Sequence, residues 1–379
     1  MKAIRGTVGL LAVATLVGAC AMPFEMQRAT PVSTFCPEQA QSRSVDGPPD
    51  TTELRWYRSV NERDMRLGAQ WCATVGGPVM RLAPTSSFPP WEEPAGLEVV
   101  TWNMNIGGGD LFDFLHTELG LDCTAPTPTL EGWANPFVLL LQEVYRFSED
   151  LPVVASGSAV PWTIDPEDRP GEDPDIVEAA ERCGLALVYV PSARNGPDSG
   201  SRPSEDKGNA VLSTLPLTAP IAIDLPHEGG RKVAVAATVN APGGERVRVV
   251  SVHLDVASTL ARTLTSGNQT RARQVSGLID GLDRAQRDGP LTAATLVGGD
   301  FNTWAGNETT LRLMRQAFPE SPEWDGRGTR GSFPTDHMYF RRGSFRTLSI
   351  DGYRRLDNRY NSDHLARRLT VHYDPVRSH

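Results

Sequence analysis

Thr295-Leu296-Val297-Gly298-Gly299-Asp300-Phe301-Asn302 is the stretch of sequence that decides the fold. Its apolar first residues are typical of a strand that is buried on both faces. The two glycines that follow allow the backbone to approach another segment closely. Asp300 and Asn302 then stand at the strand end, where polar residues build sites at the rim of a sheet. Both residue types also favour a simple Asx-turn, which is the alternative interpretation.

Three other segments carry a short polar cluster after an apolar, strand-like run. They are Thr101-Trp102-Asn103-Met104-Asn105, Leu141-Gln142-Glu143 and Asn361-Ser362-Asp363-His364. Polar side chains that follow buried strands tend to converge at one rim of a sheet. Carboxylates, carboxamides and histidines gathered there are the groups that a hard divalent cation and a phosphoester require. The four clusters therefore predict one site.

The apolar runs also predict the elements of the main domain. We expect strands over residues 97–102, 137–141, 185–190, 210–212, 233–239, 247–254 and 295–297, and helices over 110–119 and 271–287. Both helices carry apolar residues on one face, and the run at 137–141 is apolar throughout, as in a central strand. The mixture predicts one α/β domain in which two mixed sheets have helices outside them.

The first 19 residues have the features of a signal peptide. Lys2 and Arg5 precede an apolar run that is too short to span a bilayer. The following Val17-Gly18-Ala19-Cys20 resembles the lipobox of bacterial lipoproteins, in which the cysteine is lipidated. We therefore expect lipidation of Cys20 and export to the cell envelope, at the periplasmic face of the outer or inner membrane. Secretory cleavage after Ala21 is the alternative, and it would give a secreted protein.

Residues 20–96 are expected to form a segment of their own before a main domain at 97–379. The beginning of this segment is rich in Pro, Ser and Gln, which is typical of a flexible tether. Asn61 and the apolar residues after it at helical spacing predict a short helix. Because the same region contains Trp56 and Trp71, we expect a packed accessory segment, to which the sequence assigns no function.

Four cysteines remain besides Cys20, an even number in a chain that we expect to be exported. Disulfides are therefore expected, and the spacings are unlike those of a zinc site. Four cysteines allow three pairings. The pairing of Cys36 with Cys72 and of Cys123 with Cys183 is favoured, because each bond then links two cysteines within the same region of the chain.

The formal net charge of −9 disfavours non-specific binding to a polyanion. The C-terminal residues from Arg341 onward differ, since nine arginines stand against four aspartates there. Two interpretations of this basic stretch are open: a solvated face, or a positive wall beside a phosphate site.

Seven motifs resemble, in their order along the chain, those of the endonuclease/exonuclease/phosphatase superfamily. They are Thr101-Trp102-Asn103-Met104-Asn105, Gln142-Glu143-Val144-Tyr145, Gly208-Asn209-Ala210-Val211-Leu212-Ser213, Val252-His253-Leu254-Asp255, Gly299-Asp300-Phe301-Asn302, Asp336-His337-Met338-Tyr339-Phe340 and Ser362-Asp363-His364. Each motif is weak alone, but seven in the family order are highly specific. The resemblance implies a four-layer α/β sandwich, in which two mixed β-sheets pack face to face and are flanked by helices.

The resemblance also implies where a metal ion and the phosphate would bind. Glu143 would be the main Mg²⁺ ligand, with Asn105 and Asp336 nearby in the metal shell and Mn²⁺ as a substitute ion. Asn103 would touch the scissile phosphate, and Asn209 would lie on the phosphate side. Many family members carry Asp where this chain has Asn105, which is a departure from the family pattern.

The catalytic roles implied by the resemblance fall on five residues. Asp300 would activate the attacking water, and Asn302 would orient that water or bind phosphate. His253 would be the acid or the electrostatic partner. His364, steadied by Asp363, would stabilise the transition state.

The sequence therefore predicts an exported, membrane-anchored, Mg²⁺-dependent phosphoesterase that is expected to be a monomer. Its substrate class is open among nucleic acid, phospholipid and soluble phosphate esters. The alternative is a catalytically silent envelope lipoprotein that keeps the fold as a binding scaffold. The presence of the complete set Glu143, His253, Asp300 and His364 argues against that alternative, because a scaffold does not need it.

Overall fold

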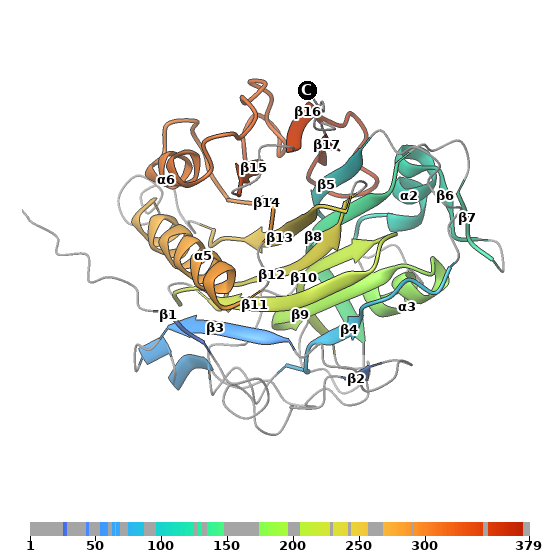
Figure 1. Cartoon of the computed structure of the whole chain (residues 1–379), viewed down its shortest axis with the longest axis horizontal. Helices are drawn as coiled ribbons and strands as arrows, with labels where there is room; N and C mark the ends of the chain where they lie inside the picture. Colours follow the sequence, from blue (N-terminus) through green and yellow to red (C-terminus); the bar gives the residue numbers. More distant parts are fainter. Residues whose placement is uncertain are drawn as a thin grey trace, which may run out of the picture.

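The computed structural model describes residues 26–28, 43–44, 54–59, 63–64, 66–68, 75–86, 96–124, 127–130, 135–147, 174–195, 205–227, 230–241, 244–256, 268–289, 292–343 and 348–373. The expected signal peptide, the lipidation site Cys20, the pair Cys36 and Cys72, and most of the expected tether lie outside these residues. Within the described ranges, two large mixed sheets pack face to face, and helices lie on both outer sides (Figure 1).

One sheet has eight strands. Its order is β16 (Leu348–Arg355), β17 (Arg367–Tyr373), β5 (Leu97–Asn103), β8 (Phe137–Phe147), β10 (Glu205–Ser213), β9 (Ala186–Asn195), β4 (Val79–Arg81) and β2 (Arg43–Ser44). The central strands β5 and β8 are parallel, and β8 pairs with β10 in the antiparallel sense.

The other sheet has seven strands. Its order is β1 (Met26–Arg28), β3 (Arg55–Ser59), β11 (Leu217–Asp224), β12 (Val233–Asn240), β13 (Arg246–His253), β14 (Ala294–Asp300) and β15 (Asp336–Arg342). Strands β13 and β14 are parallel, whereas β14 and β15 are antiparallel. A separate antiparallel pair is formed by β6 (Leu121–Asp122) and β7 (Thr129–Leu130).

Each sheet is covered on its outer face by a pair of helices. Helices α2 (Leu111–Leu119) and α3 (Ile176–Arg182) cover the eight-stranded sheet, and α5 (Asn268–Asp288) and α6 (Thr309–Ala317) cover the seven-stranded sheet (Figure 1). Helix α2 begins after its N-cap Asp110, whose side chain accepts a hydrogen bond from the backbone N–H of Asp113 at 2.9 Å, and it ends at Gly120 in the left-handed conformation. The four-layer sandwich that the resemblance implies is therefore confirmed.

Apolar residues of both sheets fill the space between the two sheets. Val211 and Leu140 come from one sheet, and Val249 and Leu296 from the other, and all four are fully buried. Burying a side chain of this size stabilises the fold by about 1.5–3 kcal/mol. Near the site the two sheets approach closely at Gly298, where a Cβ atom would lie 2.8 Å from Leu140 Cδ1. The close approach predicted for this glycine is thus an approach to the opposite sheet.

The parallel pairs bring the predicted polar clusters to one end of the sandwich. Asn103, at the end of β5, pairs in register with Gln142 on β8. His253, at the end of β13, pairs with Asp300 at the end of β14, and Asp300 in turn faces Asp336 at the start of β15. Strand pairing alone therefore gathers residues that are far apart in the sequence.

All nine elements expected from the apolar runs form, with boundaries shifted by a few residues. The largest shift is in β8, which continues to Phe147 because its second half, although partly polar, pairs with β10. Helices α3 and α6 and strands β11, β16 and β17 did not stand out in the sequence.

Residues before Leu97 also join both sheets. Strand β3 pairs in parallel with β11, and β4 pairs with β9 in the antiparallel sense. The short helix expected after Asn61 is seen at Arg63, Asp64 and residues 66–68, while its other residues lie outside the described ranges. In the described residues no helix has the length and apolar character needed to cross a membrane.

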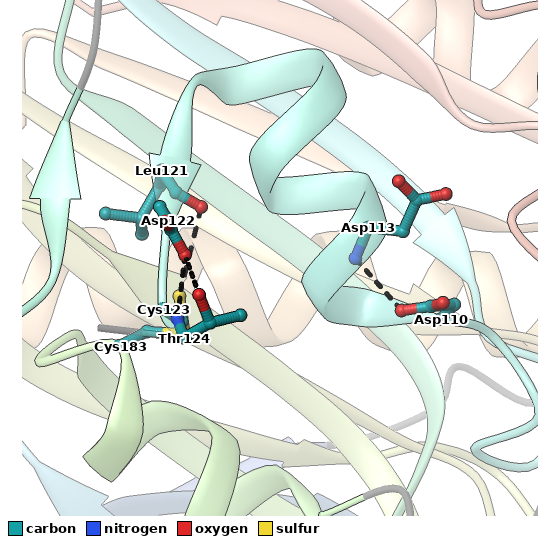
Figure 2. Close-up of a disulfide and its surroundings, with 7 residues drawn as sticks. All are labelled: Asp110, Asp113, Leu121, Asp122, Cys123, Thr124 and Cys183. Atoms are coloured by element: carbon teal, nitrogen blue, oxygen red, sulfur yellow. Dashed lines mark hydrogen bonds between the residues drawn. A yellow bond between two sulfur atoms is a disulfide. The ribbon is translucent and has the colours of Figure 1, made fainter. Parts of the chain in front are cut away.

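The disulfide expected between Cys123 and Cys183 is confirmed (Figure 2). Cys123 follows β6 directly, and Cys183 is the C-terminal cap of α3. Both cysteines are buried in the core between the helices α2 and α3 and the eight-stranded sheet. The bond thus ties the loop after α2 to the end of α3. The pair Cys36–Cys72 stays a prediction, because both residues lie outside the described ranges.

Candidate active site

A buried chain of hydrogen bonds and close charges links the ends of β5, β14 and β15 with the segment before β17. The imidazole Nδ1 of His364 lies 2.7 Å from Oδ2 of Asp336, and its Nε2 lies 3.8 Å from Oδ2 of Asp300. Asn103 Nδ2 donates to the same Asp300 oxygen at 3.0 Å. The four side chains are almost completely buried. They form the centre of the candidate site.

The carboxylate that orients His364 is that of Asp336, rather than that of Asp363, which precedes His364 in the chain. Asp363 instead forms an ion pair with Arg330, in which Asp363 Oδ2 lies 2.6 Å from Arg330 Nη2. The other carboxylate oxygen, Asp363 Oδ1, lies 3.7 Å from His364 Nε2. Adjacent residues in this bend point in different directions, so Asp363 faces the rim while His364 turns inward. Asp336 thus makes the short contact with His364, while Asp363, to which the resemblance assigned the steadying role, lies farther away and adds to the negative charge around the imidazole.

A β-bulge presents Glu143 to the site. In the pairing of β8 with β10, Leu141 is opposite Ala210 and Val144 is opposite Gly208, so two residues of β8 face Asn209 alone. Bulges of this kind re-aim side chains and occur next to active sites. Glu143 has a φ of 55°, and its Oε1 lies 3.7 Å from His253 Nδ1.

Three of the predicted site residues share an unusual backbone conformation. Asn105, Glu143 and Asn302 have φ values of 49°, 55° and 51°, in the left-handed region that non-glycine residues rarely adopt. Asparagine tolerates this region, whereas for glutamate the conformation is costly. Strained residues of this kind cluster at functional sites, which agrees with the convergence of the three residues here.

The predicted asparagines make hydrogen bonds within the protein. Asn302 donates from its backbone to Asp300 Oδ1 at 2.8 Å and from its side chain to the Leu254 carbonyl at 2.9 Å. Asn103 Oδ1 accepts from the backbone of Asn105 at 2.9 Å. Asn209 Nδ2 donates to the Val233 carbonyl at 2.6 Å. These contacts fix the loops and strands around the site.

His253 stands between two carboxylates without a short hydrogen bond to either. Its Nε2 lies 3.7 Å from Asp300 Oδ2, and its Nδ1 lies the same distance from Glu143 Oε1. Burial, followed by the positive charges of Lys232 and Lys207, lowers the pKa of His253 well below its ordinary value. The imidazole is therefore neutral at pH 7. The resemblance implies that His253 is either the acid or the electrostatic partner. Because a neutral imidazole is a poor proton donor, its neutral state favours the electrostatic role.

The charges at the centre of the site differ from those of free side chains. Burial and the neighbouring Asp336 carboxylate raise the pKa of Asp300 to about 7. Burial alone would lower the pKa of His364, but the Asp336 and Asp300 carboxylates raise it to about 10. Burial alone would raise the pKa of Asp336, but the His364 charge and hydrogen bond hold it below the ordinary value. At neutral pH the site thus contains a charged imidazole, an ionised carboxylate and a second carboxylate that is near its midpoint.

Several residues that no sequence argument assigned to the site hold it together. Ser362 donates to the Asn103 carbonyl at 2.6 Å and accepts from the backbone of His364 at 3.0 Å. Gln142 donates to Ser251 at 2.9 Å and so connects the two sheets beneath the site. Ser362 and Gln142 stand inside the motifs that carry the resemblance, and this position was the available signal. No comparable signal pointed to Ser251 or to the half-buried Lys207, whose positive charge lowers the pKa of His253.

The basic C-terminal stretch is mostly engaged in the fold. Arg367 is fully buried and pairs with Asp325, while Arg368 pairs with Glu98 at 2.7 Å. Arg341 pairs with Asp283 on α5. These arginines do not form the positive wall that one interpretation of the sequence proposed.

The donor set fits a hard divalent cation. One atom each of Asp300, Asp336 and His364 lies within 4.8 Å of the other two, and the carboxylate oxygens of Asp300 and Asp336 are possible ligands, whereas the charged His364 imidazole has no lone pair for a metal. Oδ1 of Asp336 is buried and has no hydrogen-bond partner in the described part of the chain, and an orphaned carboxylate oxygen of this kind calls for a counter-charge. Together with Glu143, these oxygen atoms are the ligands that Mg²⁺ prefers.

The chain was compared with known protein families, curated sequences and solved structures. The human Nocturnin catalytic domain with bound sulfate is 16% identical, covers 74% of this chain and 95% of its own, and has a TM-score of 0.49. An endonuclease/exonuclease/phosphatase from Beutenbergia cavernae is 16% identical, covers 74% of this chain and 73% of its own, and has a TM-score of 0.49. Sphingomyelinase C from Streptomyces griseocarneus is 17% identical, covers 73% of this chain and 99% of its own, and has a TM-score of 0.41. The comparison with curated sequences finds no match.

The family comparison is the decisive one. The sequence model of the Endonuclease/Exonuclease/phosphatase family matches residues 100–364, which is more than half of the 379 residues. The matched range begins in β5 and ends at His364, so it spans every residue of the buried centre. The chain belongs to the endonuclease/exonuclease/phosphatase family.

Proposed function

We propose that this protein hydrolyses phosphoester bonds and that it requires a divalent cation, Mg²⁺ or Mn²⁺, to do so. The observation that carries the proposal is the buried chain that joins Asn103, Asp300, His364 and Asp336. Burying two carboxylates and an imidazole in one cluster is costly for the fold. A cluster of this kind is typical of sites at which a shifted pKa serves a reaction.

Asp300 is the group that accepts the proton of the attacking water. Its pKa of about 7 is near the working pH, where a general base is most effective. Hydrogen bonds from Asn103 to Oδ2 and from the Asn302 backbone to Oδ1 fix both oxygens of the carboxylate. The water oxygen then forms a bond to phosphorus while the bond from phosphorus to the ester oxygen breaks. A phosphodiester would yield a phosphate monoester and an alcohol.

His364 stabilises the negative charge that develops on the phosphoryl oxygens. Asp336 holds the imidazole at Nδ1 and keeps it protonated, so that Nε2 presents a positive N–H group toward Asp300. Preorganised donors of this kind act strongly in a buried site. Neutral His253 adds a further dipole on the other side of Asp300. A cation held by Glu143, with Asn105 and Asp336 nearby, would supply Lewis-acid stabilisation of the phosphoryl oxygens.

A hydrolysis panel with Mg²⁺ tests the proposed function. It contains plasmid DNA, sphingomyelin, inositol phosphates and bis(4-nitrophenyl) phosphate, and it is run with the wild type and with Asp300→Asn purified in the same way. We expect turnover of at least one ester by the wild type and a large loss in the variant. Absence of turnover on every ester with Mg²⁺ and with Mn²⁺ would refute the proposed function.

We also propose that the enzyme is exported and anchored at a bacterial membrane through a lipid on Cys20, with residues 1–19 removed. The support is the charged start, the short apolar run and the lipobox-like Val17-Gly18-Ala19-Cys20. Expression of the wild type and of Cys20→Ala in a Gram-negative host, followed by detergent phase separation, tests this proposal. The wild type should enter the detergent phase and the variant should not. Recovery of both in the aqueous phase would indicate a soluble secreted enzyme instead.

A further inference from the structure

Two exposed aromatic side chains stand together on the loops that follow Asp300 and precede Asp336. Trp304 and Phe333 have exposed fractions of 36% and 40%, which places them among the few exposed large hydrophobic side chains in the described residues. Their ring centroids are 4.7 Å apart, and the ring planes are tilted by 59°. Exposed apolar groups that gather in this way often mark a binding surface.

The backbone holds this aromatic pair close to the catalytic carboxylates. Trp304 follows Asp300 by four residues, and Phe333 precedes Asp336 by three. Asp300 and Asp336 face each other across β14 and β15. Chain length alone keeps the Cα atom of Trp304 within about 14 Å of the Asp300 Cα atom, and the Cα atom of Phe333 within about 11 Å of the Asp336 Cα atom.

Hydrogen bonds lock the two loops that carry the rings. The backbone N–H of Phe301 donates to the Thr335 carbonyl at 2.8 Å. The hydroxyl of Thr303 donates to the Pro334 carbonyl at 2.5 Å. On the far side of Trp304, its backbone N–H donates to Glu308 at 2.6 Å. The rings therefore form a fixed surface rather than a pair of freely moving side chains.

A positively charged side chain, that of Arg330, stands on the same turn as Phe333. Arg330 and Phe333 exchange backbone hydrogen bonds of 3.3 Å and 3.1 Å across a tight turn, in which Gly331 has a φ of 60°. The side chain of Arg330 is 50% exposed and pairs with Asp363, the neighbour of His364. The Arg330 side chain is therefore tied through Asp363 to the segment that carries His364.

We propose that Trp304 and Phe333 form a stacking subsite that selects phosphoesters carrying a nucleobase next to the scissile phosphate, with Arg330 contacting a neighbouring phosphate. The inference rests on the proposed phosphoester hydrolysis. Aromatic side chains beside a cation are the arrangement by which proteins bind single-stranded nucleic acid and nucleotides. The net charge of −9 weakens a purely electrostatic hold on a polyanion, so contact with the base has to supply binding.

The geometry favours a base over a lipid. Both rings are more than half buried, and their backbone is fixed, which suits a flat partner that slides onto a preformed surface. Side chains that insert into a bilayer lie instead on an apolar face that can enter the headgroup and acyl region. The tilt of 59° allows a planar base to stack on one ring while it meets the other.

The test compares two fluorescein-labelled single strands of equal length and equal charge. One strand is oligothymidylate, and the other carries tetrahydrofuran abasic residues in place of every nucleoside. Binding is measured by fluorescence polarisation with the full mature chain carrying Asp300→Asn, in Mg²⁺, with and without Trp304→Ala or Phe333→Ala. Turnover of both strands by chains with Asp300 intact is measured in parallel. Vesicles of phosphatidylcholine and sphingomyelin form a third arm.

We expect the parent chain to prefer the base-bearing strand. Trp304→Ala and Phe333→Ala should each reduce that preference by about 5- to 150-fold, which corresponds to about 1–3 kcal/mol per stacked base. Trp304→Phe should keep most of the preference, because it retains a ring. Phe147→Ala is the matched control, since Phe147 is also an exposed aromatic residue, 38% exposed, and follows Glu143 by four residues, but its ring packs against Tyr145 and not against Trp304 or Phe333. It should keep the preference.

Three results would overturn the inference. Equal binding of both strands by the parent chain is the first, and an equal loss of binding to both strands in Trp304→Ala, which would indicate a structural role, is the second. Binding to vesicles that depends on Trp304, without binding to either strand, would assign the pair to a lipid surface. A base preference that depends on Trp304 without turnover of any ester would support the subsite and refute the proposed function, so the two failures are distinguishable.

Discussion

Asp300 and His364 form the chemical centre of the site because each needs the other and Asp336 to reach its working charge. Asp300 is buried beside a second carboxylate, which raises its pKa, while the two carboxylates keep His364 protonated. The result is a base that is ionised only near and above neutral pH, next to an acid that stays charged. Groups whose environments push their pKa values apart are typical of acid–base pairs at active sites.

We expect Asp300→Asn to lower kcat by about 10²- to 10⁴-fold, the usual cost of removing a general base. The substitution is nearly isosteric, and the single amide oxygen of the new side chain can keep one of the two hydrogen bonds that Asn103 and the Asn302 backbone donate to Asp300. The folded state should therefore survive, as circular dichroism and thermal melting would show. Turnover of at least half the wild-type value would contradict the role of Asp300.

The pKa values predict the pH dependence of kcat/KM. Asp300 must be ionised to accept a proton, so activity should fall as the pH drops through about 7. His364 must be protonated to stabilise negative charge, so activity should fall again as the pH rises through about 10. Initial rates measured from pH 4 to pH 11 on bis(4-nitrophenyl) phosphate provide the check. A rate that stays constant down to pH 4 would contradict the assignment of Asp300 as the base.

At the scale of single elements, strand pairing explains why the site lies where it does. The bulge of β8 against β10 turns Glu143 out of the ladder, and the register of β13, β14 and β15 places His253, Asp300 and Asp336 side by side. The alternation of a strand shows which residues share a face, but it does not reveal a bulge. The special position of Glu143 was therefore visible in the sequence only through its family motif.

The disulfide is the second feature that belongs to this scale. We expect replacement of Cys123 and Cys183 by serine to lower the free energy of unfolding by about 2–4 kcal/mol, because the bond closes a long loop. The separation of the two cysteines is 60 residues. Urea denaturation of the double variant measures the loss, and the wild-type protein measured under the same non-reducing conditions is the reference. Free thiols at Cys123 and Cys183 in the unreduced protein would contradict the prediction.

At the scale of the whole molecule, residues before the family match are part of the sandwich. Trp56 and Met80 lie in the core between the sheets, and Arg231 lies over the Trp56 ring at 5.4 Å. Gly76 donates its backbone N–H to the buried Asp206 at 2.9 Å. The described part of this segment therefore closes sheet edges and covers the core, as the packed accessory segment expected from the tryptophans would do.

We expect a chain that begins at residue 87 to be strongly destabilised. It would lose Trp56, Tyr57 and Met80, whose burial contributes roughly 5–9 kcal/mol at about 1.5–3 kcal/mol each. That is a large share of the roughly 5–15 kcal/mol that is typical of a whole protein. Soluble yield and thermal melting of the truncated chain give the comparison. The point variant Trp56→Ala reports on the same packing at full length, and unchanged melting of both chains would contradict the prediction.

The sequence predicted the main elements of the fold because buried strands of this protein are continuous apolar runs, as at 137–141 and 295–297. It did not predict β16, whose residues are mostly half-buried or exposed, or α6, which is mostly polar. For the site, the motifs identified the residues that converge. They did not identify Asp336 as the partner of His364, because that contact depends on how the segment before β17 folds back onto β15. The aromatic pair joins residues 304 and 333, and only the tertiary structure brings these together.

The central claim is that a divalent cation and this buried cluster together hydrolyse a phosphoester. The most direct measurement is the rate of bis(4-nitrophenyl) phosphate hydrolysis by the mature chain in Mg²⁺, after EDTA treatment, and after Mg²⁺ is restored, for the wild type and for Glu143→Gln. We predict that activity disappears in EDTA and returns with Mg²⁺, and that Glu143→Gln needs a higher Mg²⁺ concentration for half-maximal rate. Full activity in EDTA, with no metal detected in the protein, would contradict the account.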